Sequence, residues 1–449
     1  MNEKSLKFPK KPFRTFGGVS VPHKKATSVM ESIIMPPPQK VIIPMKQHIG
    51  AACVPTVTVG EYVKVGRVIG DSEEYVCAPI HASISGKVTK IGSAVMPTGE
   101  KVQCVTIESD GSMTEDSFMF PPVVTSVADL TKIARESGLV GLGGAGFPAH
   151  IKLNIPENKK IDTLIVNVAE CEPYITSDHR EAIENSWAVL SGVYTVKQIL
   201  KIKRVLIAVE ENKPDVIKEL EKIADNKSRD PKNEVRVFPL KTCYPQGAEK
   251  VLIQACTGRQ VPQGKLPADV GCLVMNVTSI AFLANYIKTG MPLINKRVTV
   301  DGSAIRRPCN VIAPIGTPVH DIIEFCGGYL QTPKKLLMGG PMMGTAISDD
   351  TVPIMKHTNA IIAFGENEAR VPEPTECIRC GRCVRACPMK LMPTAICQAV
   401  KVKDTEKMRD FGIMSCMECG CCSYSCPAHR FIVQTMRTGK AMVKNAGSR

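Results

Sequence analysis

The cysteines are the residues whose spacing most clearly indicates chemistry. Two runs near the end of the chain, CIRCGRCVRACP and CMECGCCSYSCP, each follow the pattern C-x2-C-x2-C-x3-C and end in proline. Thiolates at this spacing hold the irons of two [4Fe–4S] clusters, three ligands coming from one run and the fourth from the other. The sequence therefore predicts one cluster on Cys377, Cys380, Cys383 and Cys426, and a second cluster on Cys416, Cys419, Cys422 and Cys387.

Zinc is the alternative metal, because paired C-x2-C motifs also bind structural zinc. The third cysteine at the same step and the Cys-Pro ending occur in both runs and favour iron–sulfur clusters. Cys421 is out of register and is predicted not to be a ligand. The N-terminus lacks the apolar segment of a secretory signal, so the remaining cysteines are expected to be thiols rather than disulfides.

Composition places the chain among ordinary packed proteins. It has 449 residues, of which 44% are hydrophobic and 22% are charged, and this balance excludes a disordered chain. No apolar run reaches the roughly 18 residues that a transmembrane helix needs. We therefore expect a cytoplasmic protein without a transmembrane helix of its own.

The chain carries a net charge of +14, concentrated at its two ends. A basic surface could meet nucleic acid, anionic lipid or an acidic protein, or it could simply be a solvated face. Aromatic residues make up only 5% of the chain, which is few for stacking on single-stranded nucleic acid.

The elements that must position these residues fall into several types. Residues 40–110 read as short strands punctuated by glycine and proline, and they resemble the barrel-sandwich hybrid of biotinyl and lipoyl domains. Strand patterns at 162–169 and 204–209 alternate with helical patterns at 127–138, 180–201 and 213–225, as in a parallel α/β layer. Short strands with a helix near 318–326 follow, and helices at 392–402 and 428–438 frame the cysteine runs.

We therefore predict a multidomain α/β protein. Its expected parts are a basic arm (1–38), a barrel-sandwich-hybrid β domain (39–112), a Rossmann-like α/β domain (124–290), a β-grasp module of the SLBB type (291–346) and a helical two-cluster ferredoxin-like domain (370–440).

A glycine loop, GLVGLGGAGFPAHIK, begins the α/β region. Gly141, Gly143 and Gly146 form G-x-G-x-x-G, but the preceding segment reads as a helix, so the loop lacks the context of the Rossmann fingerprint. Such a backbone can approach a flat or phosphorylated ligand closely, and a structural turn is the alternative. Glu170 and Glu172 follow a predicted buried strand, at the edge where α/β folds bind ligands.

These residues together resemble a known family. The loop GLGGAGFPAHIK, the segments NVAECEPY and YPQGAEK, and the two cysteine runs are similar to the C subunit of the Rnf complex. The likeness extends to TFGGV, IPMKQHIG and APIHASISGKV. The middle of the chain is also similar to the flavin- and NADH-binding subunit of respiratory complex I. The resemblance implies a peripheral NADH-binding subunit, on the cytoplasmic face of the cell membrane, of an ion-translocating ferredoxin:NAD oxidoreductase.

The likeness to complex I implies individual cofactor contacts. Residues that would contact FMN are Gly141, Gly143, Gly144, Lys152, Asn167, Glu170, Tyr244, Gly247, Glu249 and Asn276. Residues that would contact NADH are Phe147, Glu172 and Lys265. The chain departs from the complex I pattern at Leu142, Ala169, Met275 and Tyr174, which stand where an arginine, an aspartate, an asparagine and a glycine are expected.

The implied chemistry is electron transport. NADH exchanges two electrons as hydride whereas a cluster passes one, and a flavin can do both. Electrons from reduced ferredoxin would reach the clusters through a partner iron–sulfur subunit and pass through FMN to NAD+, or run in reverse. No side chain is predicted to act as a catalytic acid, base or nucleophile.

Three other functions remain open from the sequence. One is a cobalamin reductase-like flavoprotein of bacterial microcompartments, which resembles this family. Another is a flavin-free iron–sulfur adaptor, and the last is a zinc-bound nucleic-acid protein.

Overall fold

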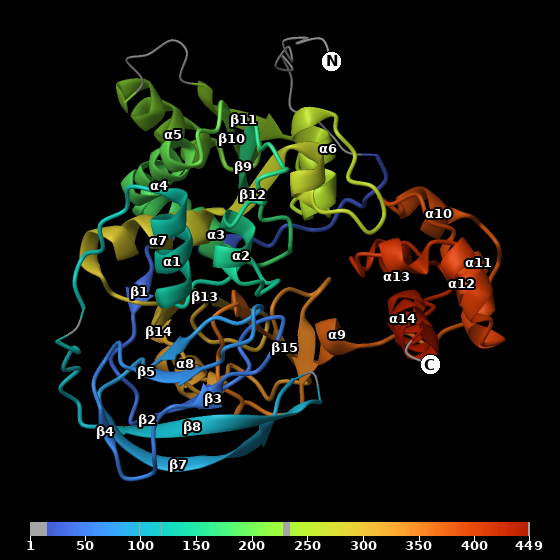
Figure 1. The fold of residues 1–449 in the computed structure, drawn as a ribbon. Helices are drawn as coiled ribbons and strands as arrows, with labels where there is room; N and C mark the ends of the chain where they lie inside the picture. Colours follow the sequence, from blue (N-terminus) through green and yellow to red (C-terminus); the bar gives the residue numbers. More distant parts are fainter. Residues whose placement is uncertain (1–15, 98, 118, 228–233, 448–449) are drawn as a thin grey trace.

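The computed structural model describes residues 16–97, 99–117, 119–227 and 234–447 of the chain (Figure 1). The first fifteen residues of the predicted basic arm therefore lie outside the described residues. The rest of the arm contains a short 3-10 helix, Ala26–Val29, and strand β1 (Ile33–Ile34). β1 pairs in parallel with β14 (Cys309–Pro314), so the arm joins a sheet formed by residues far along the chain.

The predicted barrel-sandwich hybrid is confirmed as two small sheets packed together. One sheet has the order β2-β8-β7-β4, with β2 (Lys40–Pro44), β8 (Lys101–Ser109), β7 (Gly86–Val95) and β4 (Tyr62–Val63). The other has the order β3-β5-β6, with β3 (Val54–Pro55), β5 (Val68–Asp71) and β6 (Ile80–His81). Apolar side chains from both sheets, including Ile43, Ile69 and Ile107, form their shared core.

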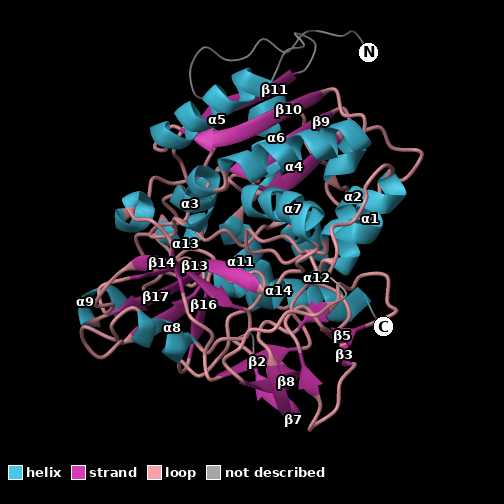
Figure 2. Cartoon of the chain, turned by 90° about the vertical axis from the view of Figure 1, so that its left-hand side faces the viewer, coloured by secondary structure: helices cyan, strands magenta, loops and turns pink. Residues whose placement is uncertain are grey.

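A four-stranded parallel sheet forms the centre of the α/β unit. Its order is β11-β10-β9-β12, with β9 (Thr163–Val168), β10 (Arg204–Glu210), β11 (Glu234–Leu240) and β12 (Cys272–Asn276). The helices around it are α1 (Val127–Glu136), α2 (Ala149–Leu153), α3 (Ser177–Glu184), α4 (Ser186–Ile199), α5 (Pro214–Lys227), α6 (Glu249–Thr257) and α7 (Val277–Thr289), with a 3-10 turn at Pro267–Val270. Figure 2 shows this sheet and its helices at one end of the molecule, with β2, β7 and β8 at the other.

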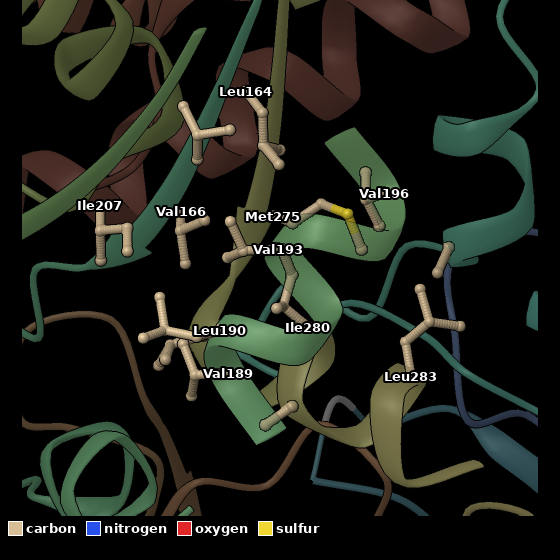
Figure 3. Packing of buried hydrophobic residues seen from close by; sticks show 14 of the residues in the cluster. Leu164, Val166, Val189, Leu190, Val193, Val196, Ile207, Met275, Ile280 and Leu283 are labelled. Atoms are coloured by element: carbon tan, nitrogen blue, oxygen red, sulfur yellow. The ribbon is translucent and has the colours of Figure 1, made fainter. Parts of the chain in front are cut away.

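Both faces of this sheet are buried, which explains the continuous apolar runs of its strands. Leu164 and Val166 of β9 pack against Val189 and Val193 of α4 (Figure 3). Ile165, between them in the sequence, faces the opposite side and packs with Leu252 of α6. Alternate residues of a strand point to opposite faces, and each fully buried side chain of this size contributes about 1.5–3 kcal/mol to folding.

One predicted helix is divided in the structure. The helix expected at 180–201 is two helices, α3 and α4, separated at Asn185, whose φ of −120° is not helical. The first of them begins earlier than predicted because the Glu170 carboxylate accepts hydrogen bonds from the backbone N–H of Asp178, at 2.8 Å, and from the Ser177 hydroxyl, at 3.3 Å. These bonds satisfy polar groups at the start of the helix.

The SLBB unit is a six-stranded sheet of order β1-β14-β13-β17-β15-β16. Its remaining strands are β13 (Asn295–Asp301), β15 (Lys335–Met338), β16 (Thr345–Ile347) and β17 (Ala360–Phe364), and helix α8 (Val319–Phe325) lies near the position predicted for it. Strand β17 joins this sheet by pairing with both β13 and β15.

Short helices form the cysteine-rich unit, drawn in red at one side of Figure 1. After α9 (Glu366–Ala369) come α10 (Arg382–Ala386), α11 (Pro393–Lys401), α12 (Thr405–Asp410), a 3-10 turn at Ile413–Ser415, α13 (Cys421–Tyr424) and α14 (Ile432–Gly447). The last helix begins at 432 rather than 428 because His429 adopts a positive φ of 49°. Over the described ranges, no helix combines the length and the apolar character needed to cross a membrane.

Candidate functional site

A cavity of about 870 Å³ opens where the β domain, the α/β unit, the SLBB unit and the cysteine-rich unit meet. Pockets of this size commonly hold small molecules and cofactors. All ten residues predicted to contact FMN line it: Gly141, Gly143, Gly144, Lys152, Asn167, Glu170, Tyr244, Gly247, Glu249 and Asn276. Phe147 and Glu172, predicted to contact NADH, line it as well.

The glycine loop forms one wall of the cavity, between α1 and α2. Gly141 donates its N–H to the carbonyl of Phe147 at 2.8 Å and accepts from the N–H of Gly146 at 3.1 Å, so the loop closes on itself. A Cβ at Gly143 would lie 2.8 Å from Nδ2 of Asn276, whereas a Cβ at Gly144 would meet nothing within 4 Å. The loop thus packs tightly on one side and leaves bare backbone on the other, which fits a flat or phosphorylated group.

Polar side chains reach the cavity from the carboxyl ends of two parallel strands. Asn167 lies near the end of β9 and donates to the carbonyl of Gly247 at 2.8 Å. Asn276 ends β12, caps α7 by accepting from the N–H of Thr278 at 3.0 Å, and donates to Asp178 at 2.7 Å. Burial raises the pKa of Asp178 to about 6, and the nearby Glu170 acts in the same direction. This edge of a parallel sheet is where α/β folds bind ligands.

Two ion pairs line the cavity with both of their side chains, Lys46–Glu100 from the β domain and Lys152–Glu249 from the α/β unit. Nζ of Lys152 lies 2.7 Å from Oε1 of Glu249, and both side chains are about one-third exposed. An ammonium group in the same cavity as bare glycine backbone is a suitable partner for a phosphate. The donor set of the cavity therefore fits a flavin mononucleotide, with Lys152 as the cation that would meet its phosphate.

Glu172 and Tyr244 occupy the side of the cavity that faces the cysteine-rich unit. The Glu172 carboxylate accepts from the backbone N–H groups of Met342 at 3.0 Å and Met343 at 2.9 Å. Burial nevertheless raises the pKa of Glu172 to about 7. The Tyr244 hydroxyl, buried, donates to the carbonyl of Cys419 at 2.7 Å, which joins the cavity wall to a predicted cluster ligand.

An N-terminal strap, residues 16–25, ties these parts together. Gly18 donates to the carbonyl of Ala386 at 2.9 Å, and Val19 exchanges two backbone hydrogen bonds with Tyr244. Glycine is required at 17 and 18, since both have φ above 70° and a Cβ at Gly18 would lie 2.5 Å from the Tyr244 carbonyl oxygen. The strap ends at Lys25, whose Nζ donates to the carbonyls of Glu170, Glu172 and Ile175 beneath the cavity.

The second cysteine group, Cys387, Cys416, Cys419 and Cys422, surrounds a small internal cavity of about 20 Å³. Burial raises the pKa of Cys416, and the neighbouring Cys419 and Cys387 raise it further. The four thiols come from both cysteine runs, as the predicted crossed pattern of ligands requires. Met417 lines this cavity and the large one, so the two sites share a wall.

The first cysteine group, Cys377, Cys380, Cys383 and Cys426, lies closer to the surface. Cys377 and Cys380 are exposed, and Cys383 is buried. Burial raises the pKa of Cys383, and the nearby Cys426 and Cys377 raise it further, which again joins thiols of both runs.

Cys421 lies beside the second cysteine group. It lines the same small cavity as that group. Its own Sγ lies 3.8 Å from the carbonyl oxygen of Tyr244, toward which the thiol donates. A thiol engaged with a backbone carbonyl accords with the prediction that Cys421 is not a ligand, and this remains a prediction.

Some residues behave differently from expectation. Lys265 does not belong to the cavity lining, so its predicted contact with NADH stays a prediction without geometric support. Of the four departures, Ala169 and Met275 line the cavity, whereas Leu142 is buried and Tyr174 packs edge-on against Phe364, with ring centroids 5.4 Å apart.

Sequence reasoning also missed part of the lining. The β domain contributes Lys46, His48, Met96 and Glu100, the SLBB unit and the segment after it contribute residues between 338 and 359, and the cysteine-rich unit contributes Met417. The segments IPMKQHIG and GGPMMG were the available signals, because the first places polar residues beside a glycine and the second is rich in glycine, whose backbone can approach a ligand closely.

Four family models match consecutive parts of the chain. They are the RnfC barrel sandwich hybrid domain at residues 13–112, the Nuo51 FMN-binding domain at 134–285, the SLBB domain at 297–346 and a 4Fe-4S dicluster domain at 370–427. Together with the cavity and the two cysteine groups, they define a flavin-binding protein with two [4Fe–4S] clusters. The dicluster match decides between iron–sulfur and zinc in favour of iron–sulfur.

Full-length relatives identify the family. The chain is 42% identical to the C subunit of the proton-translocating ferredoxin:NAD(+) oxidoreductase complex of Clostridium ljungdahlii, over 98% of this chain and 95% of that one. It is 40% identical to the C subunit of the Na(+)-translocating ferredoxin:NAD(+) oxidoreductase complex of Acetobacterium woodii, over 94% and 96%. The chain belongs to the family of C subunits of ion-translocating ferredoxin:NAD oxidoreductase complexes, as the sequence resemblance predicted.

A solved structure shows the same fold in part. The chain superimposes on a chain of an NAD+-reducing [NiFe]-hydrogenase with a TM-score of 0.50 and 15% identity, over 72% of this chain and 62% of the hydrogenase chain. At this identity the likeness concerns the fold alone.

Proposed function

We propose that this chain is the peripheral subunit through which an ion-translocating membrane complex exchanges electrons with NAD(H), at the cytoplasmic face of the membrane. The observation that carries the proposal is the convergence of twelve of the thirteen predicted FMN and NADH residues on one cavity. That cavity shares Met417 with the second cysteine group.

FMN and two [4Fe–4S] clusters, when bound, supply the conversion between hydride and single-electron chemistry. The chain's own groups provide binding and orientation. We propose that Lys152 binds the flavin phosphate and that the bare backbone of Gly144 lets the flavin lie close to the glycine loop. Phe147 and Glu172 would contact the nicotinamide nucleotide. Glu172 also holds a proton near neutral pH, because burial raises its pKa to about 7.

The arrangement of the cysteine groups supports a direction through the molecule. Tyr244 and Met417 lie between the large cavity and the second group. The first group presents Cys377 and Cys380 at the surface, beside the exposed Arg379, Arg382 and Arg385. We assign the first group to exchange with a partner iron–sulfur subunit, and its basic surroundings favour an acidic partner.

Anaerobic reduction tests the proposal. The full chain, loaded with clusters and FMN, should show bleaching of both flavin and cluster absorption when NADH is added. A chain that takes up clusters and never retains flavin would instead be an iron–sulfur adaptor. A flavin-loaded chain that NADH does not bleach would contradict the nucleotide assignment.

A matched pair of variants sharpens this test. Lys152→Met should weaken FMN binding by about tenfold or more, since a charge-assisted hydrogen bond is worth about 1.5–3 kcal/mol. Lys265→Met removes the same charge outside the cavity and should retain flavin. Equal flavin loss in both variants would show that net charge, rather than position, governs binding. A raised KM for NADH in Lys265→Met alone would restore its predicted role.

A further inference from the structure

A thiol pair in the β domain lies outside both cysteine groups. Sγ of Cys53 is 3.4 Å from Sγ of Cys77, and both side chains are buried. Nε2 of the buried His48 lies 3.9 Å from the first sulfur and 3.7 Å from the second. The electron-transfer role proposed above uses none of these three side chains.

A buried ammonium group, Lys356, adds charge to this cluster. Its Nζ donates to the carbonyls of Pro79 at 2.6 Å and Gly138 at 2.7 Å. Burial lowers the pKa of Lys356 to about 8, while Cys53, Cys77 and Asp71 act in the opposite direction. A buried cation needs a counter-charge.

The thiol pair can supply that counter-charge. The carboxylate of Asp71 is already paired with Arg135 at 2.7 Å, which leaves the two thiols as the remaining acidic neighbours of the ammonium. The hydrogen bond from Cys53 lowers the pKa of Cys77 to about 5. Sγ of Cys53 also lies 3.4 Å from the carbonyl oxygen of Ala78, to which only a protonated thiol can donate, so we assign Cys53 as the thiol and Cys77 as the thiolate.

A metal ion is the alternative occupant, because three ligand atoms lie within 4.8 Å of one another. The tautomer of His48 argues against it. Nε2 accepts the backbone N–H of Ala78 at 3.1 Å, so its lone pair is already used. Among the residues that the structure describes, this group also has only three members, whereas zinc normally takes four ligands.

The pair is connected to the large cavity through a short segment. His48, Ile49 and Gly50 line that cavity. Ile49 donates its N–H to the carbonyl of Gly146 in the glycine loop at 3.0 Å, and Ala51 donates to the carbonyl of Val76 at 3.0 Å. The segment between His48 and Cys53 therefore contacts the glycine loop at one end and carries the thiol at the other.

We propose that Cys53 and Cys77 form an oxidation site, in which peroxide converts the two thiols to a disulfide and so fixes the segment that contacts the glycine loop. The Cys77 thiolate attacks one peroxide oxygen, the O–O bond breaks, and Cys77 becomes a sulfenic acid, while the leaving hydroxide takes up from solvent the proton that the Cys77 thiol released and becomes water. The Cys53 sulfur then attacks the Cys77 sulfur, the S–O bond breaks, and the proton of the Cys53 thiol leaves with the hydroxide as a second water. Two thiols and one peroxide thus give one disulfide and two waters.

A second thiol pair provides an internal control. Cys309 and Cys326 of the SLBB unit are also buried and 3.4 Å apart, but their charged neighbours are Arg307 and Asp301 rather than a buried lysine. The full chain, loaded with clusters and kept anaerobic, is treated with stoichiometric hydrogen peroxide. Differential alkylation and peptide mapping then measure each thiol.

We expect Cys53 and Cys77 to lose their free thiols together, with a linked peptide lighter by about two mass units, while Cys309 and Cys326 stay reduced. In Cys53→Ser, dimedone should capture Cys77 as a sulfenic acid, and in Cys77→Ser the thiol of Cys53 should remain. Capture of Cys53 rather than Cys77 would overturn the assignment of the nucleophile. Equal oxidation of both pairs would show that sulfur proximity alone is responsible.

Two further readouts complete the test. Hydrogen exchange at the amides of Ile49 and Ala51 should slow in the oxidised chain, because the cross-link restricts local opening. Unchanged exchange would overturn the connection to the glycine loop. One zinc ion per chain, lost in Cys77→Ser and protecting both thiols from peroxide, would make this a metal site instead.

Discussion

The two cysteine groups share one sequence pattern and occupy opposite environments. The second group surrounds an internal cavity, shares Met417 with the large cavity and is bonded to Tyr244 through the Cys419 carbonyl. The first group has two exposed cysteines and three exposed arginines beside it. The repeated spacing fixes which metal centre forms, whereas tertiary packing fixes which partner each centre faces.

Removing one ligand from each group should separate their roles, with the largest effect of any change considered. Cys419→Ala and Cys380→Ala should each lower the iron content from about eight to about four atoms per chain. In Cys419→Ala, NADH should no longer reduce the remaining cluster, because the centre next to the cavity is lost. In Cys380→Ala, NADH should still reduce one cluster, as followed by electron paramagnetic resonance. The reverse result would exchange the two assignments.

Charge reversal at the exposed group should change partner exchange alone. Arg379→Glu with Arg382→Glu should slow electron exchange with an acidic acceptor protein by about tenfold at low salt, because steering by opposite charge is lost. Stopped-flow traces at increasing ionic strength measure this, and the difference from the unaltered chain should shrink with salt. Reduction of the second cluster by NADH should stay unchanged. An equal slowing of the reduction of the second cluster by NADH would mean that the variant disturbs the whole cysteine-rich unit.

Glu172, on the interior side, should give the stability of the chain a pH dependence. Its pKa is about 7 in the folded chain and is near 4.5 when unperturbed. Between about pH 4.5 and pH 7 the folded chain therefore holds a proton on Glu172 that the unfolded chain has released. The free energy of unfolding falls as pH rises through this range. The loss amounts to about 2 kcal/mol, reduced because the side chain is only partly buried. Glu172→Gln should flatten this slope in thermal unfolding, whereas Glu373→Gln, on the exposed surface, should not.

The smallest effect is expected at the bond between the cavity wall and the second group. Tyr244→Phe removes the hydroxyl that donates to Cys419 and should cost about 1 kcal/mol, while the ring keeps its place. Both clusters should still assemble, and their reduction by NADH should slow by less than about tenfold. Loss of the second cluster in this variant would show that the hydrogen bond, rather than the cysteines alone, holds that site together.

The sequence predicted the parts of the site that depend on local spacing. Cysteine steps, the glycine loop and the polar end of β9 could each be located from short segments, and the strands at 163–168 and 204–210 were predicted to within a residue or two, whereas Asn276 at the end of β12 came only from the resemblance to complex I. The predictions that were wrong concern elements whose bounds depend on residues far away in the sequence. The helix break at Asn185 lies in a stretch that reads as continuous, and the early start of α3 requires the carboxylate of Glu170. Nothing local shows that Lys46 or Met417 reaches the cavity, because only the packing of separate units brings them there.

The N-terminal strap has a consequence for how the protein is made. Gly18 and Val19 leave the ribosome among the first residues, yet the hydrogen-bond partners of the strap include Ala386, which emerges after most of the chain. Val19 can pair with Tyr244 as soon as that residue has been synthesised, whereas the bond from Gly18 to Ala386 must wait for the cysteine-rich unit. A Cβ at Gly17 would lie 2.9 Å from the carbonyl oxygen of Cys387, so the strap packs closely against the backbone of a predicted cluster ligand. Docking of Gly17 and Gly18 against Cys387 and Ala386 therefore follows synthesis of the first cysteine run.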